Sequence, residues 1–280
     1  MELLRPSSAD EARAALGDGA VAISGGAEVV PLMYHRLLVP TKLVDVREAV
    51  PRGIDGRTIG AGTKLAELEV DPQIPDALRD ACKQSASPQL RSMSTIAGNL
   101  LQATRCWYWR LEYPCYLHGG DRCHAKEGEH REHAILGHEL CASAHPSDLA
   151  PALIALGATL RTTHRELPVA DLYRLPTLDD RATTTLAPDE LILDVKLPEV
   201  EASVYRKATD RKAWSFPLVG VAGARVAGET RLALAGVAPI PWPISSVEDL
   251  DAATPLPQTG YKLTIARALV RRVLSELASL

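Results

Sequence analysis

Residues 20–28 read AVAISGGAE, and this stretch decides how the first part of the chain is organised. The apolar run Ala20–Ile23 predicts a short strand, and a helical pattern follows through Leu38. The two are joined by Ser24-Gly25-Gly26-Ala27-Glu28. Adjacent glycines allow positive φ and a close approach of the backbone to a ligand, and N–H groups at the start of a helix suit a phosphate. An ordinary tight turn explains the same residues, and the G-x-G-x-x-G spacing of dinucleotide-binding proteins is absent.

Outward from this stretch, strands and helices alternate. Lys42–Val46 predicts the next strand, so the chain begins with a β–turn–α–β unit. Further on, Thr63 is expected to cap a helix that runs toward Val70. Pro75–Ser85 predicts another helix, and Cys82 on it is interpreted as a small core residue.

The composition shifts toward strands from about residue 177, so we place a domain boundary near residue 175. Alternating patterns predict strands at 191–197, 203–207 and 231–237. A last helix is expected from Thr264 to Leu277, with its apolar face formed by residues four apart: Ile265, Leu269, Val273 and Leu277.

Bulk properties exclude several classes of partner. A net charge of −4 gives no sign of nucleic-acid binding. No apolar run is long enough to span a bilayer, and the first residues lack the pattern of a signal peptide. We therefore expect a cytoplasmic protein, in which five cysteines are thiols or metal ligands rather than disulfides.

The segment 105–144 departs from the alternating pattern. It contains four cysteines in the spacing Cys106-x8-Cys115-x7-Cys123-x17-Cys141, together with five of the eight histidines. Apolar residues are sparse between residues 112 and 139, so the segment is expected to need a staple to become ordered. Four thiolates suit an iron–sulfur cluster or zinc, and the spacing alone leaves iron–sulfur, zinc and no metal open.

Two polar segments are further candidates for a binding site. In Ser94–Leu100, Thr95 and Asn99 offer donors and Gly98 allows close approach, although an ordinary loop would look the same. Ser147-Asp148 precedes a predicted helix, and a capping role alone explains both residues. Lys207 and Arg211 lie in a charged stretch that is solvated surface by default.

Together these segments resemble the FAD-binding subunits of the xanthine dehydrogenase and carbon monoxide dehydrogenase family. The likeness runs nearly end to end and in the same order. It is closest to the flavin subunits of bacterial aldehyde oxidoreductases and 4-hydroxybenzoyl-CoA reductases, which carry a cysteine-bearing insert at the same place. The residues that carry it are SGGAEVVPLMYHRLLVPTKLVDV (24–46), IGAGTKLAELE (59–69), SPQLRSMSTIAGNLLQATRCWYWR (87–110), HPSDLAPALIALGA (145–158), YRKATDRKAWSFPLVGVA (205–222) and LAGVAPIPWPI (234–244).

The resemblance implies an α+β fold in which two FAD-binding subdomains (about 1–52 and 53–175) precede a smaller α+β C-terminal domain (176–280). The cysteine-rich insert occupies 105–144 of the FAD-binding domain (1–175). The C-terminal domain is expected to be built on a three-stranded sheet with helices.

The resemblance also implies two cofactors, FAD and a [4Fe-4S] cluster. The first loop would wrap the FAD pyrophosphate, Asp148 would bond the ribityl hydroxyls and Lys207 would lie near the isoalloxazine. The residues so assigned to FAD are Val21, Ala22, Ile23, Ser24, Gly25, Gly26, Ala27, Glu28, Val29, Thr95, Gly98, Asn99, Asp148, Ile192 and Lys207. The implied cluster ligands are Cys106, Cys115, Cys123 and Cys141, and Cys82 is not one of them.

One departure concerns the first loop, where family members usually have A-G-G-T and this chain has Ser24-Gly25-Gly26-Ala27. Loss of the threonine hydroxyl removes one phosphate hydrogen bond, worth roughly 1 kcal/mol.

The function implied is electron transfer within a heterotrimer. A large molybdenum-cofactor subunit would carry the substrate chemistry and a small subunit the [2Fe-2S] centres, while this chain passes electrons through FAD to an external acceptor. Two alternatives remain open: a stand-alone flavin oxidoreductase of related fold, and a zinc-stapled interaction protein without flavin.

Overall fold

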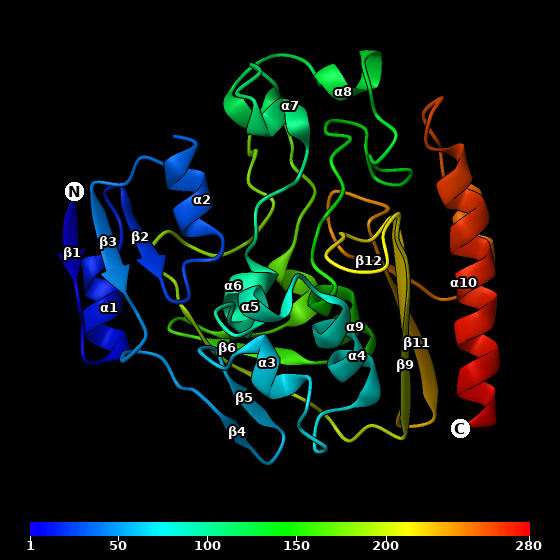
Figure 1. Cartoon of the computed structure of the whole chain (residues 1–280), viewed down its shortest axis with the longest axis horizontal. Coiled ribbons are helices and arrows are strands. Elements are labelled where there is room, and N and C mark those ends of the chain that lie inside the picture. The colour runs from blue at the N-terminus through cyan, green and yellow to red at the C-terminus, as the bar shows by residue number, and fades with distance from the viewer.

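A computed structural model describes residues 1–280. Its strands form three sheets that follow one another along the longest axis (Figure 1). None of its helices combines the length and the apolar character needed to cross a bilayer.

The N-terminal sheet is parallel and has the order β1-β3-β2. Its strands are β1 (Glu2–Leu4), β2 (Ala20–Ile23) and β3 (Lys42–Asp45), connected through α1 (Ala9–Ala15) and α2 (Val29–Tyr34). Ser8 begins α1 by accepting a hydrogen bond from the Glu11 N–H. The second helix has only six residues and ends at Tyr34, so the prediction of helix through Leu38 was too long.

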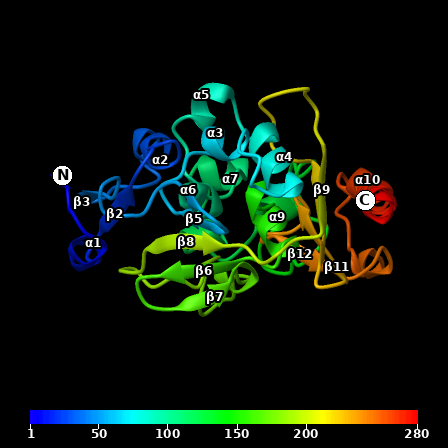
Figure 2. The ribbon, with the colours of Figure 1, turned by 90° about the horizontal axis from the view of Figure 1, so that it is seen from below.

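The central sheet has five strands in the order β4-β5-β8-β6-β7, all antiparallel. They are β4 (Ile54–Asp55), β5 (Thr58–Gly60), β6 (Thr159–Thr162), β7 (Glu166–Pro168) and β8 (Ile192–Lys196). In Figure 2 the helices of this part lie together on one side of β6, β7 and β8. These helices are α3 (Leu65–Leu68), α4 (Asp76–Gln84), α5 (Pro88–Arg91), α6 (Ile96–Leu100) and α9 (Leu149–Ala155), with the short η2 (Val169–Leu172) after β7.

The cap predicted for α3 is wrong. The Thr63 hydroxyl bonds the backbone N–H and carbonyl of Gly53, and the residue that precedes the helix is Lys64. Thr63 therefore ties two loops together instead of starting a helix.

The C-terminal sheet is antiparallel, with the order β12-β11-β10-β9. It consists of β9 (Ala202–Ala208), β10 (Val219–Val226), β11 (Glu229–Ala235) and β12 (Trp242–Ile244), followed by η3 (Glu248–Ala252) and α10 (Gly260–Ser279). The expected three-stranded sheet thus has a fourth, three-residue edge strand. The helix begins four residues earlier than expected, and its buried stripe consists of Lys262, Ala266, Val270, Val273 and Leu277.

The position of β8 bears on the domain boundary. This strand lies beyond residue 175, yet it pairs with β5 and β6 of the central sheet. The boundary near 175 stays a prediction, and sheet membership alone favours a position after Lys196.

The first half of the cysteine-rich insert stands away from the three sheets, at the top of Figure 1, whereas Ile135 and Leu136 of its second half pack against the C-terminal sheet. The regular structure of the insert is limited to α7 (Trp107–Arg110), η1 (Tyr116–His118) and α8 (His124–Glu127).

Candidate functional site

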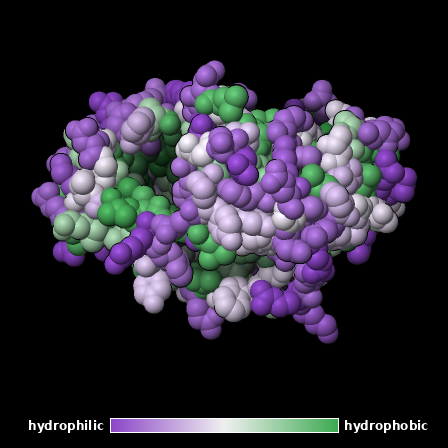
Figure 3. Space-filling view, turned by 90° about the horizontal axis from the view of Figure 1, so that it is seen from above, coloured by the Kyte–Doolittle hydropathy of each residue, from purple (hydrophilic) through white to green (hydrophobic).

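A cavity of about 450 Å³ lies where the first loop meets the helices of the central part. Figure 3 shows a hollow in the surface beside the part formed by the N-terminal sheet and its helices. Its volume falls in the range of small-molecule and cofactor sites. Eleven of the residues assigned to FAD from the sequence line this cavity: Ala22, Ser24, Gly25, Gly26, Ala27, Glu28, Val29, Thr95, Gly98, Asn99 and Asp148.

The two glycines of the first loop are required for different reasons. A Cβ on Gly25 would lie 1.8 Å from the Met93 carbonyl oxygen, so the loop packs directly on the neighbouring backbone. Gly26 has φ +71°, which L side chains rarely adopt. Because α2 is short, the donors that this loop offers to a ligand come from the loop's own backbone.

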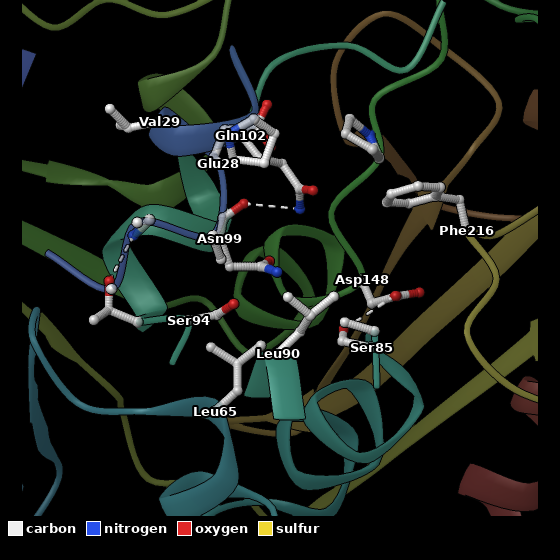
Figure 4. A pocket seen from close by; sticks show the side chains of 18 of the residues that line it. Glu28, Val29, Leu65, Ser85, Leu90, Ser94, Asn99, Gln102, Asp148 and Phe216 are labelled. Carbon is white, nitrogen blue, oxygen red and sulfur yellow. Dashed lines mark hydrogen bonds between the residues drawn. The ribbon is translucent and has the colours of Figure 1, made fainter. Parts of the chain in front are cut away.

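Thr95 and Asn99 present oriented donors from α6. The Thr95 hydroxyl caps the helix by accepting from Gly98 N–H at 3.1 Å, so its own hydrogen is free for a ligand. Asn99 Oδ1 accepts from the Ser147 hydroxyl at 2.6 Å. This bond fixes the amide, which points into the cavity in Figure 4.

The sequence suggested a capping role for both Ser147 and Asp148, and the structure shows that only Ser147 caps the helix. Ser147 Oγ accepts from Ala150 N–H at 3.0 Å and caps α9, whereas Asp148 makes no cap bond. The Asp148 carboxylate instead accepts from Tyr205 Oη at 2.5 Å and from Lys207 Nζ at 2.9 Å.

Ser85 completes the set of donors to this carboxylate, with its hydroxyl 3.1 Å from Asp148 Oδ2 (Figure 4). Burial raises the pKa of Asp148, and the Lys207 ammonium and the two hydroxyl donors oppose that shift. The result is a carboxylate held in one orientation at the cavity wall.

Four residues assigned from the sequence lie outside the cavity wall, namely Val21, Ile23, Ile192 and Lys207. Ile192 is buried in the main core. Lys207 lies behind Asp148, and its ammonium also donates to the carbonyls of Gln84 and Ser215. The assignment of all fifteen residues to FAD stays a prediction, and these four do not line the cavity.

The sequence did not reveal the part of the wall that comes from the loop between β9 and β10. Arg211, Trp214, Ser215 and Phe216 line the cavity, and Phe216 lies across the cavity from Val29 in Figure 4. Phe216 is the only phenylalanine of the chain, and it and Trp214 are 48% and 61% exposed. In the sequence, the aromatic residues that follow the charged stretch were the signal that could have indicated this part of the wall.

The four cysteines of the insert line one small cavity together with aromatic side chains of α7 and η1. Cys82 lies elsewhere, fully buried in the main core as expected. No three Cys, His, Asp or Glu side chains lie close enough together to hold a single metal ion. The four thiols therefore converge on a shared space rather than on one point.

Neighbouring groups act on these sulfurs. Burial raises the pKa of Cys106 to about 12 and that of Cys141 to about 11. His133 Nε2 lies 3.2 Å from Cys106 Sγ, and Ala142 N–H donates to Cys123 Sγ at 3.5 Å. Such buried thiols ionise when a cationic centre binds them, and N–H donors then stabilise the sulfur charge.

Comparison with known proteins identifies the family of the chain. Residues 1–200 match the family described as the FAD binding domain in molybdopterin dehydrogenase. The chain is 34% identical to the aldehyde oxidoreductase FAD-binding subunit PaoB of Escherichia coli, over 92% of this chain and 91% of that protein. A 95-residue part, 31% of the chain, is 34% identical to 6-hydroxypseudooxynicotine dehydrogenase complex subunit alpha of Paenarthrobacter nicotinovorans, covering 32% of that protein.

Solved structures agree on the fold. All of this chain and 97% of a chain of carbon monoxide dehydrogenase from Hydrogenophaga pseudoflava superpose with a TM-score of 0.71 at 23% identity. Quinoline 2-oxidoreductase of Pseudomonas putida gives a TM-score of 0.69 at 18% identity, with 100% and 97% of the two chains covered. The chain belongs to the family of FAD-binding domains of molybdopterin dehydrogenases, the FAD subunits of molybdenum-containing oxidoreductases.

Proposed function

We propose that the chain is the FAD- and [4Fe-4S]-binding electron-transfer subunit of a heterotrimeric molybdenum hydroxylase. The observation that carries this proposal is the adjacency of two sites along the chain. Arg105 lines the large cavity and the next residue, Cys106, lines the cysteine cavity. A flavin and a cluster in these places would be held by neighbouring residues.

The residues of the large cavity fit FAD. The loop 24–29 offers backbone N–H groups to the pyrophosphate, and Thr95 and Asn99 offer side-chain donors. Three donors occupy three of the roughly four lone-pair sites of the Asp148 carboxylate, so one remains that can accept from a ribityl hydroxyl. Lys207 would act through Asp148, because its ammonium is occupied by that carboxylate and two carbonyls.

Bound FAD supplies a centre that exchanges electrons singly or in pairs. The chain's own contribution is to bind and orient it. Asp148 is held by three donors, so it keeps its position when a ligand arrives. The loop 211–216 adds the aromatic side chains of Trp214 and Phe216 to the cavity wall.

We assign the cysteine cavity to a cluster rather than to zinc. Thiolates bound to one zinc ion at 2.3 Å lie only about 4 Å from one another. No three potential ligands gather this closely, whereas all four sulfurs line the same space. Four cysteines that line one space supply the four thiolates that a [4Fe-4S] cluster takes.

The charged residues of the FAD cavity argue against a stand-alone oxidoreductase. They are Glu28, Arg105, Asp148 and Arg211, and each is already hydrogen-bonded within the chain. No side chain is left as a free general base for an organic substrate. Substrate chemistry therefore belongs on a molybdenum-cofactor subunit, with a small [2Fe-2S] subunit as the electron link and an external acceptor beyond FAD.

An absorption spectrum together with iron and sulfide analysis tests the proposal. Anaerobically purified protein should show flavin bands, a broad iron–sulfur shoulder and about four irons per chain. Flavin without iron would overturn the cluster, and zinc without flavin would favour the stapled interaction protein. Affinity purification from the native host should recover the two partner subunits, and a monomer that oxidises an organic substrate alone would contradict the heterotrimer.

A further inference from the structure

The carboxylate of Glu28 joins the FAD loop to the beginning of the cysteine-rich insert. Glu28 follows the two glycines, and its side chain lies at the cavity in Figure 4. Its Oε2 accepts from Arg105 Nη2 at 2.5 Å, and its Oε1 accepts from Arg110 Nη2 at 2.8 Å and Ala103 N–H at 3.1 Å. All three donors come from a single stretch more than 70 residues further along the chain.

These donors surround Cys106. Arg110 Nε also donates to the Thr104 carbonyl at 2.9 Å, and the Cys106 N–H donates to Thr104 Oγ1 at 3.2 Å. The Glu28 carboxylate and the Arg110 guanidinium therefore fix the turn that presents Cys106.

The same carboxylate acts on the cavity through Arg105. The Arg105 guanidinium lines the cavity and lies 4.8 Å from the centroid of the Phe216 ring, another wall residue. Arg110 does not line the cavity. One carboxylate thus holds a guanidinium that faces the cavity and a second that faces the insert.

Charge makes this arrangement depend on Glu28. The Glu28 side chain is 15% exposed, and those of Arg105 and Arg110 are 30% and 18% exposed. Two guanidiniums in this partly buried position repel each other unless a carboxylate lies between them. Without it, both the wall of the cavity and the Cys106 turn lose the group that holds them.

We propose that Glu28 is a positioning residue that couples FAD binding to the order of the segment 103–112. The proposal rests on the proposed function, since it takes the large cavity as the FAD site. FAD that orders the first loop then also orders the Cys106 turn, and by reciprocity an ordered turn strengthens FAD binding.

FAD titrations of the flavin-stripped full-length chain test the coupling. Glu28→Gln and Arg110→Gln should each weaken FAD binding about tenfold, a typical coupling between two sites. The double variant should bind FAD about as weakly as either single variant, because both changes break one link. Asp251→Asn is the matched control, since it removes a carboxylate paired with Arg267 on the exposed surface of the C-terminal part.

Backbone hydrogen exchange adds a measurement on the wild type, which decides the matter even if a variant fails to fold. FAD should slow exchange in both 24–29 and 103–112 of the wild type, and in Glu28→Gln only the first stretch should respond.

Each outcome is decisive. Protection of 24–29 without 103–112 in the wild type, unchanged affinity in Arg110→Gln, or additive losses in the double variant would overturn the coupling alone. Absence of protection at 24–29 would overturn the assigned FAD site and the coupling with it.

Discussion

The proposed FAD cavity and the cysteine-rich insert obtain their order from different sources. One side of the cavity is formed by residues at the ends of α3, α4, α6 and α9, whose buried faces belong to the main core. The first loop and the loop between β9 and β10 complete the wall. The insert has three helical segments of four, three and four residues, and within 105–128 only Cys115 and Ala125 are buried. A cavity built on a packed core can exist before its ligand binds, whereas we expect the first half of the insert to need the proposed cluster for its order.

The second half of the insert (129–144) is ordered by its contacts with the C-terminal part. Ile135 and Leu136 pack in the core of the C-terminal part, and His130 and His138 bond the backbone of 254–258. The expectation that the whole insert needs a staple is therefore wrong for 129–144. Two of the five histidines of the insert, His130 and His138, thus have structural partners.

The largest effect is expected from removing the thiols. Changing Cys106, Cys115, Cys123 or Cys141 to Ser should each abolish iron binding, because each removes one ligand from the shared cavity. Protease sensitivity should rise within 105–128 and remain low in 129–144. Iron, sulfide and peptide mapping after limited proteolysis measure both.

Cys82→Ser is the matched control for this series. Cys82 is fully buried in the main core, so the variant should keep about four irons and lose only modest stability from the buried hydroxyl. Iron loss in Cys82→Ser alone, or zinc in place of iron, would contradict the assignment of the ligands.

The next effect concerns the cavity. Gly26→Val introduces a β-branched residue at φ +71° and a Cβ 3.1 Å from Val30 Cγ2. The strain amounts to about 1–2 kcal/mol or more, and the loop backbone should shift away from its ligand, with FAD content falling by about tenfold. Iron content should fall less than flavin content. A Gly26→Val protein with full FAD would remove the loop from the site.

The sequence could predict features that depend on short-range patterns, but not those that depend on long-range contacts. The strand and the glycine loop were predicted from short-range patterns and from the resemblance. Asp148 was assigned to the site by the resemblance alone, since its pattern indicated a helix cap that the structure does not show. Eleven of the assigned residues line the cavity. The strand β10 and the aromatic loop before it were not, since their place depends on pairing with β9 and β11. Buried Lys262 was also unforeseeable, because its partners are backbone carbonyls more than 25 residues away.

Lys262 provides a test of the second half of the insert through pH. Its ammonium donates to the carbonyls of Glu132 and Gly236, and burial lowers its pKa from 10.5 to about 7, with the Glu132 carboxylate opposing. Between those values the folded chain binds fewer protons than the unfolded chain, so stability rises with pH. Relative to Lys262→Met, the wild type should gain on the order of 3 kcal/mol from pH 7 to about 9.5.

Denaturant unfolding at several pH values measures this difference. The two carbonyls that lose their donor in Lys262→Met cost the same at every pH, so they leave the slope unchanged. Lys196→Met, at an exposed position of β8, is the control and should run parallel to the wild type. Parallel curves for Lys262→Met as well would show that the ammonium does not titrate in this window.

The smallest effect separates stability from binding at the cavity itself. Ser147→Ala removes the cap of α9 and the donor to Asn99 Oδ1, which should cost about 1 kcal/mol of unfolding free energy. FAD affinity should fall only a few-fold, since the Asn99 amide keeps its place on α6 but loses its orienting bond.

Asp148, the next residue, makes no cap bond, and Asp148→Asn should weaken FAD binding more than Ser147→Ala does. Because both residues precede the same helix, paired measurements of unfolding free energy and FAD affinity distinguish the cap from the ligand. Equal losses of affinity in the two variants would mean that Asp148 serves the packing of α9 rather than the flavin.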